Sequence, residues 1–293
     1  MLITKKDRNT IAGAGFALAF ISAICWALPG QLSLLIPIMF SLVFALVLIL
    51  EIYRRVNSNL YDLQDQLGTL ISKTATTAEV GSAIRQMEAL ISLHSALKPE
   101  RPFPNANDFA AAPDLLNQLS QLIFQRKPKL VVETGSGLST LIIAYSLKRL
   151  GHGNLISLEN DSLYASTIRD MIAMHHMDAI AHVFHAPLVE HDIHGQPWQW
   201  YDTTNIPLEK PIDLLFIDGP VQLASPCARY PAFSVLKQYI GLNTVFLLDD
   251  AKRNDEQEIV RRWQHEHPQL RCKYLDFKKG AYLLHFENPG ASE

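Results

Sequence analysis

The apolar residues of this chain form two long charge-free runs before a more polar, strongly periodic remainder begins. Residues 11–28 and 32–50 contain no charged side chain. As a helix, each run is about 27 to 30 Å long, which is the thickness of a bilayer core. Pro29-Gly30 lies between them and is typical of a tight turn. We therefore expect residues 1–50 to form a transmembrane helical hairpin.

Basic residues flank this segment on both outer sides. Lys5, Lys6 and Arg8 precede the first run, and Arg54 and Arg55 follow the second. The positive-inside rule then places both ends in the cytoplasm, which predicts a multi-pass protein of the inner (cytoplasmic) membrane with its C-terminal domain in the cytoplasm. A cleaved signal peptide and a buried hairpin of a soluble domain are the alternatives. The second run disfavours the first of these, and the lack of an amphipathic face disfavours the other.

Residues 51–98 have the pattern of a helical stalk. Their apolar side chains alternate spacings of three and four, as in a coiled-coil seam. The seam consists of Tyr53, Val56, Leu60, Leu63, Leu67 and Leu70. We expect an interruption at Thr74–Thr77. A homodimer through this stalk is one interpretation, and a single amphipathic helix lying on the following domain is the other.

Residues 99–293 alternate between strand and helix patterns, after a proline-rich linker. Strands are expected at 131–133, 155–159, 181–185, 212–218 and 244–249. Helices are expected from Pro113 until Pro128 stops the first of them, at 138–150, 161–175 and 230–240, and from Asn254, with Gln257 completing a capping box. The segment 187–211 reads as irregular, and 270–277 with 281–286 as a terminal β-hairpin. This order predicts a three-layer α/β domain of Rossmann-like type with a mainly parallel sheet.

The composition of the chain disfavours nucleic-acid binding, a disulfide framework and a zinc site. A net charge of -3 lacks the basic excess of a nucleic-acid-binding protein, so we expect no nucleic-acid partner. The 3 cysteines are too few and too scattered for a disulfide framework or a zinc site.

Acidic residues end four of the five expected parallel strands: Glu133, Glu159, Asp218 and Asp249. In such a sheet, ligands bind beyond the carboxyl ends of the strands. Glu133 precedes the turn Gly135-Ser-Gly137, whose glycines let the backbone approach a ligand, and a helix N-terminus follows. An acid at the position of Glu159 suits ribose hydroxyls. The sequence therefore predicts a nucleoside site at this edge.

Two residues distinguish between nucleoside ligands. The dinucleotide fingerprint G-x-G-x-x-G requires glycine where this chain has Thr140, and Glu133 would add negative charge beside a pyrophosphate. A cationic, phosphate-free ligand fits better than NAD. An NAD-type oxidoreductase remains an alternative, as does a non-catalytic, self-associating membrane scaffold with a cofactor-sensing domain.

Three motifs resemble those of class I S-adenosylmethionine (SAM)-dependent methyltransferases, in particular the bacterial O-methyltransferase and methyltransferase-24-like groups. They are Glu133-Thr-Gly-Ser-Gly-Leu-Ser-Thr140, Ser157-Leu-Glu159-Asn160 and Leu215-Phe-Ile-Asp218-Gly-Pro220. The segment Leu247-Leu-Asp249-Asp250-Ala251 and the terminal hairpin are similar to the same family. The resemblance covers about 108–286 and implies a seven-stranded sheet whose last strand is antiparallel.

The resemblance also implies roles for individual residues. The predicted cofactor-binding set is Glu133, Gly135 and Gly137 at the methionine part, Ser139 and Thr140 closing over it, Glu159 with Asn160 at the ribose, His185 by the adenine, and Asp218 facing the sulfonium or the substrate. The expected activity is transfer of a methyl group from SAM to an acceptor, with oxygen as the expected atom.

Acceptor activation is assigned to Asp218 and Asp249. Together with Asp250 they are similar to the metal ligands of the catechol and caffeoyl-type O-methyltransferases, which implies a divalent cation such as Mg²⁺. That subgroup usually has Asn at the position of Asp250. The alternative is structural: Asp249 ends a strand and Asp250 caps a turn. The membrane hairpin suggests a small-molecule, lipid-linked or glycan acceptor.

Overall fold

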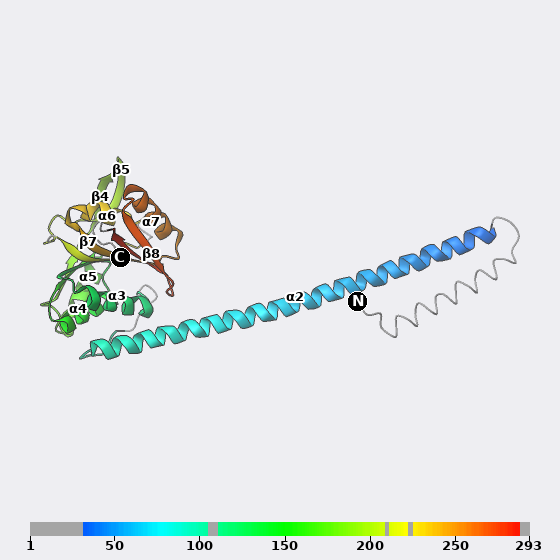
Figure 1. Ribbon diagram of the computed structural model, residues 1–293, viewed down its shortest axis with the longest axis horizontal. Coiled ribbons are helices and arrows are strands. Elements are labelled where there is room, and N and C mark those ends of the chain that lie inside the picture. The colour runs from blue at the N-terminus through cyan, green and yellow to red at the C-terminus, as the bar shows by residue number, and fades with distance from the viewer. Residues whose placement is uncertain (1–31, 105–110, 209–210, 222–224, 288–293) are drawn as a thin grey trace. The chain divides into compact units, whose positions relative to one another are not determined.

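A computed structural model of the chain describes residues 32–104, 111–208, 211–221 and 225–287. The chain divides into two compact units, 1–78 and 79–293, which are described separately (Figure 1). The described part of the first unit is helical, and it belongs to α2 (Leu32–Leu97), whose last residues lie in the second unit.

Helix α2 corrects two expectations about the N-terminal region. It runs through 74–77 without the predicted interruption, because threonine lowers helix propensity by only about half a kcal/mol and neither proline nor glycine stands there. Residues 32–50 form no separate helix but are the beginning of α2. None of the helices in the described residues is long and apolar enough to cross a membrane. The second predicted span is therefore not confirmed, and the first, 11–28, lies outside the described residues.

The end of α2 is part of the C-terminal domain. Ala89, Leu93 and Leu97 are buried in its core, beside the apolar face of α3 (Pro113–Arg126). Gln86 and Asp114 exchange hydrogen bonds: the Gln86 amide donates to Asp114 Oδ2 at 2.7 Å, and the Asp114 N–H donates to Gln86 Oε1 at 3.2 Å. The second unit consequently begins at Glu79, where the sequence had suggested a boundary at 99.

A seven-stranded sheet forms the middle layer of the domain. Its order is β3 (Ala181–His185), β2 (Asn154–Glu159), β1 (Leu130–Thr134), β6 (Ile212–Ile217), β7 (Ile240–Asp249), β9 (Ala281–Phe286) and β8 (Leu270–Leu275). The first five strands are parallel, and β9 is antiparallel to both of its neighbours. This confirms the predicted Rossmann-like sheet with an antiparallel last strand.

Helices cover both faces of this sheet (Figure 1). Helices α3, α4 (Leu138–Leu150) and α5 (Ser162–Met174) share one apolar core, and α6 (Pro231–Leu236) and α7 (Asn254–Glu266) share the other. Neighbouring residues of β1 alternate between the two cores, as the period of a strand requires: Val131 belongs to the first and Val132 to the second.

The segment after β3 is ordered where an irregular stretch was expected. Strands β4 (Leu188–Ile193) and β5 (Gln196–Tyr201) form an antiparallel hairpin. Its turn residues, His194 and Gly195, have φ angles of 58° and 78°, as a two-residue hairpin turn requires. The prediction of an irregular stretch was wrong because the strands are partly polar and the turn signal is only two residues long.

Two smaller differences concern helix ends. Helix α6 stops at Leu236 and continues as a 3-10 turn, η2 (Lys237–Tyr239), so it is shorter than expected. The predicted capping box of α7 is wrong: the N-cap is Arg253, without a side-chain cap. The Gln257 amide instead donates to the Ala251 carbonyl oxygen at 3.3 Å.

Candidate functional site

The glycine turn after β1 is packed directly against the loop after β6. Gly135 has a φ of +84°, and a Cβ on it would lie 3.0 Å from the Gly219 nitrogen. A Cβ on Gly219 would in turn lie 2.9 Å from Gly135 Cα, and the Thr134 hydroxyl donates to the Gly219 carbonyl oxygen at 3.0 Å. Gly135 is therefore needed first for this backbone contact, which is a different reason from the ligand approach that the sequence suggested.

Gly137 stands in more open surroundings. It is the N-cap of α4, and the nearest atom to a Cβ built on it is the Tyr164 hydroxyl oxygen at 3.8 Å. Its N–H donates to the Thr140 hydroxyl oxygen at 2.9 Å. Space for a ligand therefore exists beside Gly137, at the positive end of the α4 dipole.

Glu133 is fully buried beneath this turn. Its Oε2 accepts hydrogen bonds from the Thr140 and Ser157 hydroxyls, both at 2.6 Å, while Oε1 has no partner among the described residues. Burial raises the pKa of Glu133 to about 7, although the hydroxyls of Ser139, Ser157 and Thr140 act to lower it. Thr140 is itself fully buried, and its hydroxyl supports Glu133. Its closing over a cofactor stays a prediction.

Glu159, at the end of β2, accepts hydrogen bonds from the same turn. Its Oε2 accepts from the Ser136 N–H at 3.1 Å and hydroxyl at 3.0 Å, and its Oε1 accepts from the Asp161 N–H at 3.0 Å. A carboxylate has about four acceptor positions, so capacity remains for ribose hydroxyls. Asn160 follows directly and is half-buried, and exposed His185 is the β3 residue paired with Glu159. Their roles at a nucleoside stay predictions.

The three aspartates of the predicted acceptor site lie together at the ends of β6 and β7. One carboxylate oxygen from each of Asp218, Asp249 and Asp250 lies within 4.8 Å of the others. Asp249 Oδ1 accepts from the Asp250 N–H at 2.6 Å, whereas its Oδ2 is buried and has no partner within the described ranges. The proximity expected from the parallel strand ends is thus present.

Arg229 enters this cluster from the turn before α6. Its Nη2 donates to Asp218 Oδ1 at 3.1 Å, to the Asp218 carbonyl oxygen at 2.8 Å and to Asp250 Oδ2 at 2.8 Å. Its Nη1 donates to the Asp249 carbonyl oxygen at 3.0 Å, and its side chain is only 4% exposed. Arg229 is therefore a buried partner of the predicted acids.

Burial raises the pKa values of two acids of the cluster. Burial raises the pKa of Asp218 well above its usual range, and the charge of Asp249 adds to the effect, while Arg229 opposes it. Burial, followed by the charge of Asp250, raises the pKa of Asp249 to about 6. Both carboxyls therefore bind a proton more readily than an ordinary aspartate does.

These contacts decide whether a divalent cation fits the cluster. Three carboxylates are the oxygen donors that Mg²⁺ prefers. However, Asp218 Oδ1 and Asp250 Oδ2 already bind the same guanidinium nitrogen of Arg229. A metal ion bound to both oxygens would lie beside a like charge, so the cluster does not fit a divalent cation with Arg229 in place.

Tyr201 is a site residue that sequence reasoning did not assign. The Tyr201 ring is buried, and its hydroxyl adjoins Gly219 and has no hydrogen-bond partner among the residues described. Burial, with the nearby charge of Glu159 adding, raises its pKa well above the usual range, so the hydroxyl stays protonated. The hairpin thus delivers a hydrogen-bond donor to the site.

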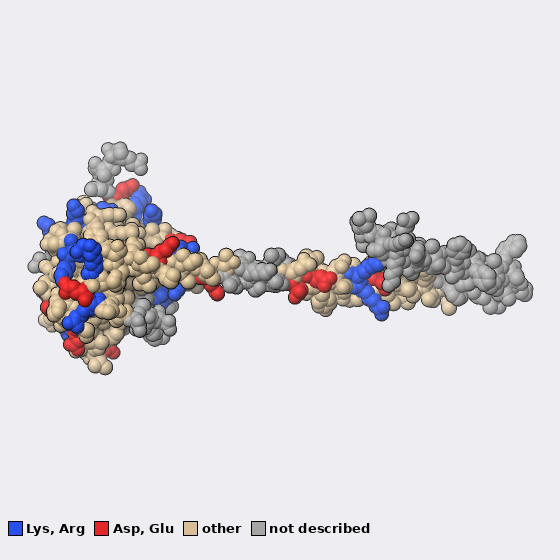
Figure 2. All heavy atoms as spheres, turned by 90° about the horizontal axis from the view of Figure 1, so that it is seen from below, with Lys and Arg blue, Asp and Glu red and all other residues tan. Residues whose placement is uncertain are grey.

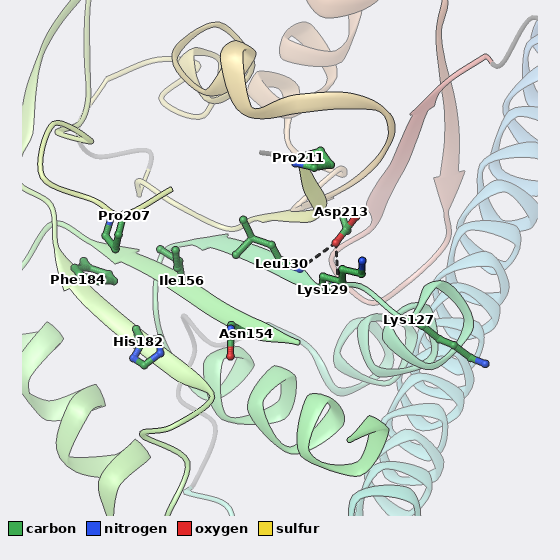
Figure 3. Close-up of a pocket in the computed structure, with 10 residues that line it drawn as sticks. All are labelled: Lys127, Lys129, Leu130, Asn154, Ile156, His182, Phe184, Pro207, Pro211 and Asp213. Carbon is green, nitrogen blue, oxygen red and sulfur yellow. Dashed lines mark hydrogen bonds between the residues drawn. The ribbon is translucent and has the colours of Figure 1, made fainter. Parts of the chain in front are cut away.

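A separate pocket of about 500 Å³ lies at the opposite edge of the sheet, where the parallel strands begin (Figure 3). Leu130, Asn154 and His182 line it, and Asp213 accepts hydrogen bonds there from the Lys129 and Leu130 N–H groups at 2.7 and 3.0 Å. The predicted site residues are absent from its lining. It is not the edge at which the chemistry is expected.

Known proteins are similar to this chain in part of its sequence and in its fold. A family described as a methyltransferase domain matches residues 132–262. The SAH-bound methyltransferase PaMTH1 from Podospora anserina is similar in structure, with 16% identity, a TM-score of 0.52, and coverage of 72% of this chain and 96% of that one. None of the curated proteins matches.

Two further solved structures are similar at lower scores. An O-methyltransferase from Bacillus cereus in complex with SAH has 18% identity and a TM-score of 0.46, covering 70% of this chain and 91% of that one. The O-methyltransferase TomG from Streptomyces achromogenes, involved in tomaymycin synthesis and solved with SAM, has 15% identity, a TM-score of 0.48, and coverage of 67% and 90%. The family match indicates a methyltransferase domain in this chain, and the likeness to the Podospora anserina structure shows the fold.

Proposed function

We propose that this chain transfers a methyl group from SAM to an acceptor oxygen. The observation that carries the proposal is a set of buried polar atoms without partners in the described structure: Glu133 Oε1, Tyr201 Oη and Asp249 Oδ2. Each such atom costs about 1 to 3 kcal/mol when it is left unpaired. Glu133 and Asp249 lie at the carboxyl ends of β1 and β7, where ligands of such sheets bind, and the Tyr201 hydroxyl on β5 adjoins Gly219 in the loop after β6. A cationic nucleoside and its acceptor would satisfy them.

The residues around the glycine turn suit the cofactor. Glu133 offers an acceptor to the positively charged methionine part, Gly137 leaves room beside the α4 N-terminus, and Glu159 retains acceptor capacity for ribose hydroxyls. Bound SAM supplies an electrophilic methyl group on a sulfonium. The protein contributes position, since the acceptor must attack in line with the bond that breaks.

The Asp218–Asp249 pair suits removal of the acceptor proton. A general base works best with a pKa near the operating pH, and the pKa of Asp249 is raised to about 6. Asp218 is the more open of the two acids, and Arg229 fixes one of its oxygens. We assign proton removal to this pair and orientation of the acceptor hydroxyl to Asp218.

Calorimetry with SAM and with NAD tests the proposal. The wild-type chain is expected to bind SAM and not NAD, and Glu159→Ala to weaken SAM binding at least about tenfold, since it removes the ribose acceptor and the brace of the turn. Asp178→Ala, which removes an exposed acid outside the site, is the control. Binding of NAD without SAM would support the oxidoreductase alternative and overturn the proposal.

We also propose that the N-terminal region holds the chain at the cytoplasmic membrane, with the domain in the cytoplasm and a lipid-linked or glycan acceptor. Large apolar side chains at the beginning of α2 are exposed, among them Met39 and Leu42 at 63% each, and charged residues begin only at Glu51. Figure 2 shows blue and red side chains farther along this helix. Such a surface is stable only against lipid or protein.

Cell fractionation tests the location. The full chain is expected in the membrane fraction, and Leu42→Lys with Leu46→Lys is expected to weaken that association. Leu60→Lys, on the predicted stalk, is the control for location and also tests the homodimer, because it would disrupt the seam that includes Val56 and Leu63. A wild-type chain found wholly in the soluble fraction would contradict the proposed location.

A further inference from the structure

We propose that Arg229 takes the place of a divalent cation at the cluster of Asp218, Asp249 and Asp250, so that methyl transfer by this chain needs no metal ion. The inference rests on the proposed function for its catalytic consequence. Its structural part, a cation site occupied by the protein's own guanidinium, can be tested independently of SAM.

The hydrogen bonds show that Arg229 links all three acids. Nη2 bridges the carboxylates of Asp218 and Asp250, and Nη1 reaches the carbonyl oxygen of Asp249. Nη1 also lies 3.5 Å from Glu256 Oε1 on the first turn of α7. A planar guanidinium can satisfy several acceptors at fixed angles, which a lysine ammonium cannot do in the same way.

The charges around the cluster favour a resident monovalent cation. Arg253 adds a second contact, with its Nη2 3.0 Å from Asp250 Oδ2, and Lys279 lowers the pKa of Asp218 as a smaller contribution. Buried carboxylates require such compensation, and here the chain supplies it. A divalent ion would need oxygens at about 2.0 to 2.6 Å, and two of the available ones already accept from Nη2.

The turn that carries Arg229 is fixed to α7. The Cys227 N–H donates to Asp255 Oδ2 at 2.9 Å, and the Trp263 indole N–H donates to the Tyr230 carbonyl oxygen at 3.0 Å. Both bonds lie within three residues of Arg229 along the chain. Displacing the guanidinium to admit a metal would disturb this anchored turn, so Arg229 is built into the site.

Asp250 is adapted to the same partner. Its φ of 61° is in the left-handed region, which Asn and Asp tolerate better than most residues. In this conformation its Oδ2 accepts from Arg229 and its N–H donates to Asp249 Oδ1. The carboxylate of Asp250 gives Arg229 a charged partner. Arg229 is therefore a positioning residue that holds Asp218 at the acceptor.

Metal titration of the full-length chain, stripped with EDTA, is the direct test. Calorimetry with Mg²⁺ and with Mn²⁺ is expected to show no saturable binding to the wild type, and turnover after chelation to change less than about twofold. Saturable Mn²⁺ binding that Asp249→Asn abolishes would overturn the inference. So would an activity loss of about tenfold on chelation that Mn²⁺ restores.

Arg229→Met extends the test, with Arg261→Met as the exposed control. If the guanidinium occupies a cation site, Mn²⁺ should raise the Tm of Arg229→Met and leave the wild type and Arg261→Met unchanged. Equal effects on all three chains, or no effect on a folded Arg229→Met, would overturn the inference. If Arg229→Met does not fold, the wild-type titration decides. A chain that binds neither SAM nor metal would refute the proposed function but not the occupied cation site.

Discussion

The two halves of the candidate site compensate their buried acids differently. Around the glycine turn, Glu133 receives hydrogen bonds from the neutral hydroxyls of Thr140 and Ser157. At the ends of β6 and β7, Asp218 and Asp250 receive theirs from the cation Arg229. Among the described residues Glu133 has no ion pair, whereas the aspartates already have one with Arg229. This difference favours a cationic cofactor at Glu133 and no metal at the aspartates.

Removing the cation from the second half should have the largest effect on stability. Arg229→Met leaves Asp218 and Asp250 buried without their partner, which should lower the free energy of unfolding by about 3 to 5 kcal/mol. Urea denaturation measures the change, with Arg261→Met as a surface control expected to change by less than about 0.5 kcal/mol. Equal losses in the two variants would mean that Arg229 does not compensate the cluster.

Glu133 should make the first half sensitive to pH. Its pKa is raised to about 7 in the folded chain from a model-compound value of 4.5. The group therefore contributes stability below about pH 4.5, which is lost as pH rises through about 7, by about 3 kcal/mol in all. Urea denaturation of Glu133→Gln from pH 5 to 8 should lack this loss. SAM affinity of the wild type should rise over the same range as Glu133 ionises, whereas that of Glu133→Gln should stay low and flat.

Substitutions of the two glycines in the turn should distinguish a position that is needed for packing from one that borders the ligand. Gly135→Ala places a side chain at a φ of +84° against Gly219, so we expect a loss of about 2 kcal/mol in stability. Gly137→Ala meets no atom closer than 3.8 Å, so its stability should change by less than about 1 kcal/mol. Calorimetry should nevertheless show weaker SAM binding to Gly137→Ala. Unchanged SAM affinity in that variant would place the ligand elsewhere.

Loss of one neutral hydrogen-bond donor to Glu133 should have the smallest effect on stability. Ser157→Ala removes a hydrogen bond to Glu133 Oε2, which costs about 1 kcal/mol and raises the pKa of Glu133 further. The pH range over which stability is lost should then extend upward in urea denaturation. Ser146→Ala is the matched control, since its buried hydroxyl bonds Ser120 and the Ile142 carbonyl oxygen. If both variants show the same pH dependence, the hydroxyls do not tune Glu133.

Local patterns were enough to predict most of the domain. Helix α4 and the terminal hairpin follow from periodicity and from a glycine or a polar turn at their ends, and they lie where the sequence placed them. The hairpin at 188–201 was missed because its strands are partly polar and only His194-Gly195 signals the turn. The helix end at Leu97 joins the domain because α3 covers it, which no local pattern reveals.

The sequence by itself determined which acids reach the site. Acids that end parallel strands meet at one edge, because the order of strands and helices fixes where each strand stops. Only the tertiary structure decided how each acid is compensated. Arg229 lies on a turn without periodicity, 11 residues from Asp218 along the chain, and its contacts depend on the anchoring of that turn to α7. Burial and partners set the charge of a carboxylate, and both are properties of the folded chain.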